Sequence, residues 1–329
     1  MIKTFFAPLA GLLLGSAAPL AVADPIVIKF AHVVNDDTPK GRGALQFQKL
    51  VQERLGGQVK VEVYPNSTLV GDADELEALR SNKVQLLAPS VSKLNALSKA
   101  LQVYDLPYLF DSLEAVKRFQ RRDKSRELLG SLTSHGITGL GYWNNGGRQL
   151  SATRDIRAPE DLKGLTFRVE SSDALAAYYQ QLGAQALKLP FAQVYEALRS
   201  GKVQGAENPW SNLLGQRLNT VQPYIVEDNH NFLTYMLITN TGFWNGLPFG
   251  IRSELEAIVD EVTQAVNRDA EAINVKARER VVAANTSKIL VQTPAEREAW
   301  RTAVAPLINR YESEIGADVL RAAEAANRR

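Results

Sequence analysis

The chain has 329 residues, with 38 basic and 36 acidic side chains and no cysteine. The lack of cysteine excludes disulfides, zinc–thiolate sites and thiol catalysis. Because the net charge is only +2 and no basic block stands out, neither nucleic acid nor a membrane surface is expected as a partner. A chain of this length with 45% hydrophobic residues can bury a large core, more naturally as two domains than as one.

The first 23 residues have the features of an export signal. Lys3 supplies a positive start, residues 5–22 form a mostly apolar run, and Ala-Val-Ala before Asp24 is the small-x-small pattern that signal peptidase accepts. We therefore expect cleavage before Asp24 and a soluble mature protein outside the cytoplasm. The alternative is a single membrane anchor, against which the two prolines and the small-residue end of the run argue.

The next part of the chain alternates short β-branched runs with amphipathic helical patterns. Strands are predicted at residues 26–32, 59–64, 84–87 and 136–142. Helices are predicted between them, at residues 41–55, 72–82 and 112–129. Asp111 and Glu114 predict a capping box at the start of the last helix. This order predicts an α/β fold with mainly parallel strands.

A second α/β pattern follows, and it ends in long helices. In the run 166–170, Phe167 and Val169 share an apolar face and Arg168 lies on the other. Further strands are predicted at 221–225 and 232–240, and helices at 174–182 and 191–200. A helical pattern without Pro or Gly then runs from Arg252 to about Asn285, and the last helix begins with its own cap at Thr293-Pro294-Ala295-Glu296.

Enzymatic motifs are missing from the sequence. The three histidines, His32, His135 and His230, are too scattered for a metal-binding spacing. No nucleophile elbow, phosphate-binding loop or dinucleotide fingerprint is found. We therefore expect no catalysis, no metal and no cofactor.

Two arginines lie at positions in or next to predicted strands where a ligand could be bound. Arg168, in the middle of a strand, could grip a carboxylate through two parallel hydrogen bonds, which lysine cannot do. Its alternatives are a solvated strand face or an ion pair with Glu170 or Asp161. Arg148 follows a glycine pair at a strand end, where α/β proteins place ligands. Its alternative is an ordinary exposed loop arginine.

Asn208 and several aromatic side chains complete the candidates. Asn208 precedes a proline, which favours extended backbone and lets the side chain present its amide. Alternatively, Asn208 bonds its own backbone in a turn. Aromatic side chains cluster in the same stretches, and as a group they are more typical of core than of a pocket wall: Trp143, Phe191, Tyr195 and Trp210.

At these residues the mature chain resembles a known family, the periplasmic binding subunits of TRAP (tripartite ATP-independent periplasmic) transporters, and most of all the C4-dicarboxylate branch. The resemblance runs from about Ile26 to the C-terminus in the family's order. It is carried by these stretches: KFAHVVNDDTPKGRGA (29–44), VEVYPNSTLVGD (61–72), DLPYLFDSLEAV (105–116), GLGYWNNGGRQLSATR (139–154), DLKGLTFRVESSD (161–173), PFAQVYEALRSGKVQGAENPWSN (190–212), ITNTGFWNGLP (238–248) and EIGADVL (314–320).

The resemblance implies two α/β lobes that close over a ligand, joined by strands and one long helix. Lobe one is expected to comprise residues 24–145 and 234–273, and lobe two residues 146–233 and 274–329. It also implies a periplasmic location, a monomer, and delivery of the ligand to one small and one large membrane subunit.

The resemblance assigns the family's ligand-gripping positions to residues of this chain. Arg168 matches the residue that holds the ligand carboxylate, Arg148 a second cation, and Asn208 a contributed amide. More weakly matched positions near the cleft are Lys40, Ser90, Lys93, His32, Asn145, Phe191 and His230. Several cations suit a dianion, because burying one without cations at both ends is costly.

One departure and three alternatives qualify this hypothesis. The family's Asp-Gly-Gln-Glu-Asn motif reads Gln-Gly-Ala-Glu-Asn over residues 204–208, which bears on specificity. The same fold could instead bind a monocarboxylate, such as a 2-oxo acid or a sugar acid. Two alternatives belong to other functional classes: a sensory binding protein and a periplasmic hydrolase. No nucleophile–base pair that would support a hydrolase is visible in the sequence.

Overall fold

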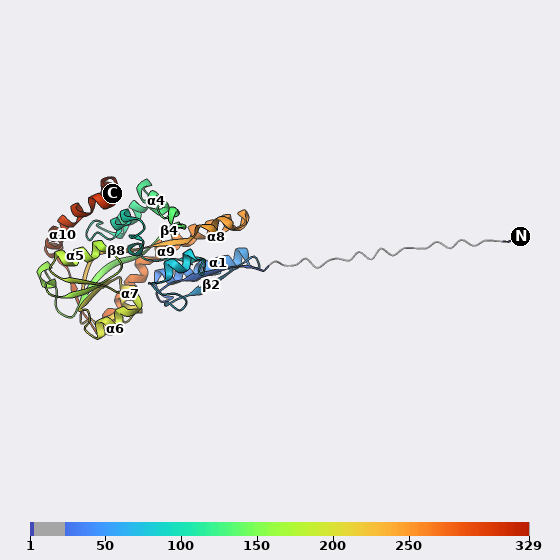
Figure 1. Cartoon of the computed structure of the whole chain (residues 1–329). Coiled ribbons are helices and arrows are strands. Elements are labelled where there is room, and N and C mark those ends of the chain that lie inside the picture. Colours follow the sequence, from blue (N-terminus) through green and yellow to red (C-terminus); the bar gives the residue numbers. More distant parts are fainter. Residues whose placement is uncertain (3–23, 329) are drawn as a thin grey trace.

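The computed structural model describes residues 1–2 and 24–328, so nearly all of the predicted export signal lies outside the described residues. Figure 1 shows α1 and β2 on one side of the molecule and α6 and α7 on the other, with β4, β8 and α9 running between them. The α/β fold predicted from the alternating pattern is confirmed. No helix in the described part of the chain is both long and apolar enough to cross a bilayer.

One mixed sheet of nine strands organises residues 24–328. At one end three strands pair in parallel: β2 (Val59–Tyr64), β1 (Ile26–Ala31) and β3 (Leu86–Leu87). Another parallel group forms the other end: β7 (Gly205–Asn208), β5 (Thr166–Val169) and β6 (Gln185–Lys188). Two long strands between the groups are antiparallel to each other, β8 (Tyr224–Asn240) and β4 (Ile137–Ala152), and β9 (Lys288–Val291) pairs with β8.

The two long strands differ from the sequence prediction. Strands were expected at 221–225 and 232–240, yet β8 is continuous over Tyr224–Asn240. Likewise β4 does not end at residue 142 but continues through the Gly146-Gly147 pair to Ala152. Three register shifts along the β4–β8 pairing absorb the irregular stretches, because a bulge takes up an extra residue without ending a strand.

Gly146 shows why the glycine pair does not break β4. Its φ is +141°, a conformation that L side chains rarely adopt, and a Cβ there would lie 2.8 Å from Nδ2 of Asn274. Asn274 itself donates to the carbonyl of Ala270 (2.9 Å) and to that of Asn145. The glycine therefore lets a helix side chain approach the strand backbone directly.

Helices cover both faces of the sheet. The predicted helix at 112–129 is two helices, and Ser112 rather than Asp111 caps the first by accepting from the amide of Ala115 at 3.2 Å. The cap predicted at Thr293 is confirmed, with both capping-box bonds present. The helices are α1 (Pro39–Leu55), α2 (Glu75–Arg80), α3 (Leu113–Gln120), α4 (Asp123–Gly130), α5 (Asp173–Gln181), α6 (Val194–Arg199), α7 (Trp210–Gly215), α8 (Thr241–Gly246), α9 (Phe249–Ala284), α10 (Pro294–Ile315) and α11 (Ala317–Ala325).

The 36-residue helix α9 confirms the long helix predicted after Arg252. It packs against two separate hydrophobic cores. Its first half contributes Leu255, Val259 and Val266 to the core around α1 and β1. Its last turns contribute Ala277 and Val281 to the core around α6 and α7. One rigid element thus ties the two parallel parts of the sheet together, as the antiparallel strands do.

Candidate functional site

Four cations predicted from the sequence lie around one largely enclosed carboxylate, that of Glu170. Arg148 comes from β4, Arg168 from β5, Lys40 from the first turn of α1, and Lys93 from a short 3-10 helix (Val91–Leu94). The first three are each only 2% exposed. All four act electrostatically on Glu170, which follows β5. The parallel strand groups and the start of α1 therefore bring distant segments to one charged site.

Arg168 has no carboxylate partner among the described residues. Its Nε and Nη2 both donate to the carbonyl of Leu189, at 3.0 and 2.8 Å. The guanidinium carbon lies 5.9 Å from the ring centroid of Phe191. Burial lowers the pKa of Arg168, because desolvation disfavours the charged form. The alternatives of a solvated strand face and of an ion pair with Glu170 or Asp161 are thus wrong.

Arg148 is held by two carboxylates. It lies inside β4, so the reading as an exposed loop arginine is wrong. Nη1 donates to Oε1 of Glu207 at 2.6 Å, and Nη2 donates to Oε2 of Glu170 at 3.0 Å. Burial alone would lower the pKa of Arg148, but the two carboxylates outweigh it and raise the pKa. Nε is buried without a partner.

The network continues behind Arg148 into a fully buried histidine. Nε2 of His230 lies 2.9 Å from Oε2 of Glu207, and Nδ1 lies 2.9 Å from Oδ2 of Asp228. Tyr179 also donates to Glu207, at 3.1 Å. Burial lowers the pKa of His230, but Asp228 and Glu207 outweigh it and raise the pKa to about 9. At neutral pH His230 is an imidazolium that holds Glu207 ionised beside Arg148.

The two lysines differ as the two arginines do: Lys93, like Arg148, has carboxylate partners, and Lys40, like Arg168, has none among the described residues. Lys93 forms ion pairs with Asp72 and Glu75. The Lys40 ammonium instead donates to the carbonyl of Ala88 at 3.0 Å and lies 3.7 Å from the ring centroid of Tyr235. Burial lowers the pKa of Lys40 to about 8. In the described part of the chain, Lys40 thus resembles Arg168 in having no ion-pair partner.

Glu170 joins the two parts of the sheet. Its Oε2 accepts from Ser90 at 2.7 Å, and Ser90 precedes the 3-10 helix on the β3 side. The same oxygen accepts from Arg148. Burial would raise the pKa of Glu170, but the charges of Arg148 and Arg168 outweigh it and lower the pKa to about 2. Glu170 is therefore a permanent carboxylate within the site.

The predicted amides and His32 have different surroundings. Nδ2 of Asn208 is buried without a partner, so the alternative that Asn208 bonds its own backbone through this group is wrong. Asn145 donates to Oδ1 of Asn212 at 3.0 Å and to the hydroxyl of Tyr235 at 3.3 Å. His32 is buried, and its nearest carboxylate is that of Asp36, 3.9 Å away. Burial lowers the pKa of His32 to about 3, so it is neutral.

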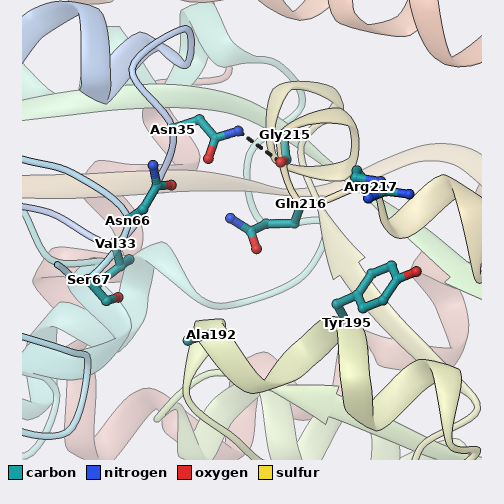
Figure 2. A pocket seen from close by; sticks show the side chains of 9 residues that line it. All are labelled: Val33, Asn35, Asn66, Ser67, Ala192, Tyr195, Gly215, Gln216 and Arg217. Carbon is teal, nitrogen blue, oxygen red and sulfur yellow. Dashed lines mark hydrogen bonds between the residues drawn. The ribbon is translucent and has the colours of Figure 1, made fainter.

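A pocket of about 410 Å³ lies beside this cluster, between segments of the two sheet ends. Figure 2 shows Asn35 and Asn66 facing Gln216 across it. Nδ2 of Asn35 donates to the carbonyl of Gly215 at 2.9 Å, which closes one side. Its lining residue Ala192 directly follows Phe191, and the amide of Phe191 in turn donates to Asp72. Asn35 and Phe191 thus make hydrogen bonds that join the two parts of the molecule.

Sequence reasoning missed several residues of the site. Glu170 was considered only as an ion-pair partner of Arg168, although its place two residues beyond Arg168 puts it on the same strand face. Glu207 was visible only as a neighbour of Asn208. Tyr235 and Asn212 gave no signal of their own, because an apolar strand and a helix start predict only packing.

The chain was compared with known proteins and solved structures. The profile of the bacterial extracellular solute-binding proteins, family 7, matches residues 30–314. The C4-dicarboxylate-binding periplasmic protein DctP of Shewanella loihica is 43% identical over 305 residues, 93% of this chain and 91% of that protein.

Two solved TRAP periplasmic solute-binding proteins have the same fold. The one from Pseudomonas aeruginosa, with bound L-malate, is 60% identical with a TM-score of 0.86, and the match covers 87% of this chain and 100% of that one. The one from Shewanella oneidensis, with bound succinate, is 42% identical with a TM-score of 0.91, over 92% of this chain and 100% of that one.

Proposed function

This chain belongs to family 7 of the bacterial extracellular solute-binding proteins, and we propose that it binds a C4-dicarboxylate such as succinate, fumarate or malate for TRAP transport. It is a solute-binding transport protein of the periplasm, not an enzyme. The relatives named above bind such ligands, and the chain is similar to them over most of its length. The charges of the site support the same ligand class.

The single observation that carries the proposal is the pair of buried cations without ion-pair partners among the described residues, Lys40 and Arg168. A buried cation without a counter-charge is costly, so it favours a bound anion. Two such cations on opposite parts of the sheet match a ligand with a carboxylate at each end. In this proposal Arg168 holds one carboxylate, aided by the amide of Asn208, and Lys40 faces the other.

The proposal changes the role expected for two cations. Arg148 and Lys93 are already neutralised by protein carboxylates. They therefore position their neighbours, and Lys40 replaces Arg148 as the partner of the ligand's second carboxylate. Ser90, Asn145, Phe191, His32 and His230 remain proposed site residues that surround or support these contacts.

We also propose how the site opens and where the ligand goes. Residues 24–145 and 234–273 form lobe one, residues 146–233 and 274–329 form lobe two, and the ligand favours the closed state by touching both. The two cores that α9 contacts support this division. The signal is cleaved before Asp24, and the closed protein delivers its ligand to a small and a large membrane subunit.

Titration calorimetry on the purified mature protein tests the ligand class. Succinate, fumarate and L-malate should bind in the micromolar range, about 8 kcal/mol. Butyrate, which is succinate without its second carboxylate, is the matched control and should bind at least 100-fold more weakly. Butyrate or a sugar acid binding as tightly as succinate would support the monocarboxylate alternative instead.

A further inference from the structure

The negative charge of Glu170 is unexpected in a site proposed to bind a dianion. Glu170 is a largely enclosed carboxylate that follows β5, two residues from Arg168, and it lies among all four cations. Its charge repels a ligand carboxylate and cancels part of the attraction that Arg148 and Lys93 would offer. A site selected only for two carboxylates would be stronger with a neutral residue at this position.

The hydrogen bonds of Glu170 leave one oxygen free. Within residues 24–328, the bonds from Ser90 (2.7 Å) and Arg148 (3.0 Å) both end on Oε2. Oε1 accepts no hydrogen bond there, and the side chain keeps 12% of its surface exposed. An ionised carboxylate accepts but cannot donate, so Oε1 is open to a donor from outside the protein, either water or a ligand.

We propose that Glu170 makes the site selective for a hydroxylated C4-dicarboxylate, because the ligand hydroxyl donates to its free oxygen Oε1. This inference rests on the proposed function and specifies its ligand. At neutral pH both carboxyl groups of such ligands are ionised, so the hydroxyl is the donor that malate has and succinate lacks. A hydrogen bond to an ionised acceptor is stronger than one between neutral groups, so it favours the ligand that brings a donor.

The low pKa of Glu170 supports this role. Because Arg148 and Arg168 keep the carboxyl ionised throughout the physiological range, it cannot itself become a donor toward a ligand carboxylate. Arg148 holds Glu170 from its own part of the sheet, and Ser90 adds a second bond from the other part, which forms only when the two parts are together. The selectivity would therefore operate in the closed state.

Calorimetry at pH 7.5 with wild type and Glu170→Gln tests the proposal. Wild type should bind L-malate at least fivefold more tightly than succinate and than 2-methoxysuccinate, whose ether oxygen cannot donate. Glu170→Gln removes the repulsion and supplies an amide donor, so the affinity for succinate should rise severalfold and the ratio should fall below two. Glu53→Gln, which makes the same change at an exposed carboxylate on α1, is the matched control, so its ratio should equal that of wild type.

The outcomes separate this proposal from the proposed function. Equal binding of malate and succinate by wild type would overturn the role of Glu170 while leaving the dicarboxylate function intact. An unchanged ratio in Glu170→Gln would do the same, since a merely structural role shifts both ligands in parallel. No binding of any dicarboxylate would instead overturn the proposed function. If Glu170→Gln does not fold, the comparison of malate with 2-methoxysuccinate in wild type decides alone.

Discussion

Arg148 and Arg168 lie twenty positions apart and are equally buried, yet they have opposite electrostatic surroundings. Arg148 contacts two carboxylates, one of which is backed by the His230 imidazolium and Asp228. Arg168 donates hydrogen bonds only to the carbonyl of Leu189 within the described residues and has no carboxylate partner there. The difference indicates that burial of a cation does not by itself mark a ligand contact. A saturated cation positions other groups, and an unsaturated one is available to an anion.

Replacing Arg148 should have the largest effect, on stability. Arg148→Met removes the one cation that is hydrogen-bonded to both Glu170 and Glu207, and it should lower the free energy of unfolding by about 3–5 kcal/mol. Chemical denaturation measures this loss. The exposed Arg126, which pairs with Asp123 at 3.3 Å, is the control. Arg126→Met should change stability by less than about 0.5 kcal/mol.

Restoring charge balance sharpens that prediction. In the double variant Arg148→Met with Glu207→Gln, one of the two uncompensated charges is gone. About half of the lost stability should return, because neighbouring substitutions in one network are not additive. Purely additive losses of stability would contradict the view that Arg148 neutralises the charges of Glu170 and Glu207.

Replacing Arg168 should act on affinity rather than on stability. Arg168→Ala should weaken succinate binding by about 30- to 5,000-fold, since losing a buried charged contact costs about 2–5 kcal/mol. Arg168→Lys should be only partly better, because an ammonium cannot give two parallel hydrogen bonds. Calorimetry gives the affinity, and denaturation should show a stability change of at most about 1 kcal/mol. Retained affinity in both variants would refute the role of Arg168.

The smallest effect concerns Lys40 and pH. Its pKa of about 8 means that the ammonium, the form that attracts an anion, is lost as the pH rises through 8. Succinate affinity should therefore fall between pH 7 and 9.5, approaching tenfold per pH unit, or about 1.4 kcal/mol. Lys40→Gln should reduce this pH dependence to the part that His230, with a pKa of about 9, contributes, whereas Lys49→Gln, on the exposed side of α1, should keep it in full. A flat wild-type profile would refute the role of Lys40.

Much of the fold could be predicted from the sequence, because its patterns are local. The alternation around Phe167 correctly placed Arg168 on the opposite face of β5, and the long run after Arg252 correctly predicted α9. The glycine pair before Arg148 misled the prediction of β4. A local pattern does not reveal that a bulge and the side chain of Asn274 accommodate the glycines within the strand.

The charge state of the site could not be predicted in the same way. Glu207 meets Arg148 across 59 positions, because the β4–β7 register sets Gln149 opposite Asn208 and Leu150 opposite Glu207. No spacing rule in the sequence contains that register. The resemblance supplied the candidate cations, but only the packed structure separates saturated cations from unsaturated ones. This is why Lys40, a weak candidate from sequence, became a leading one, and why Glu170 was missed.

The continuous strands β4 and β8 have a mechanical consequence. If the two parts of the molecule move apart, this pair of strands has to bend, since both strands run unbroken between the two parts. Its softest points are the three register shifts, one of which falls between Arg148 and Leu150. Any bending there tilts the arginine and, through its ion pairs, Glu170 and Glu207. Bending of this pair of strands would therefore also move the charged side chains that it carries.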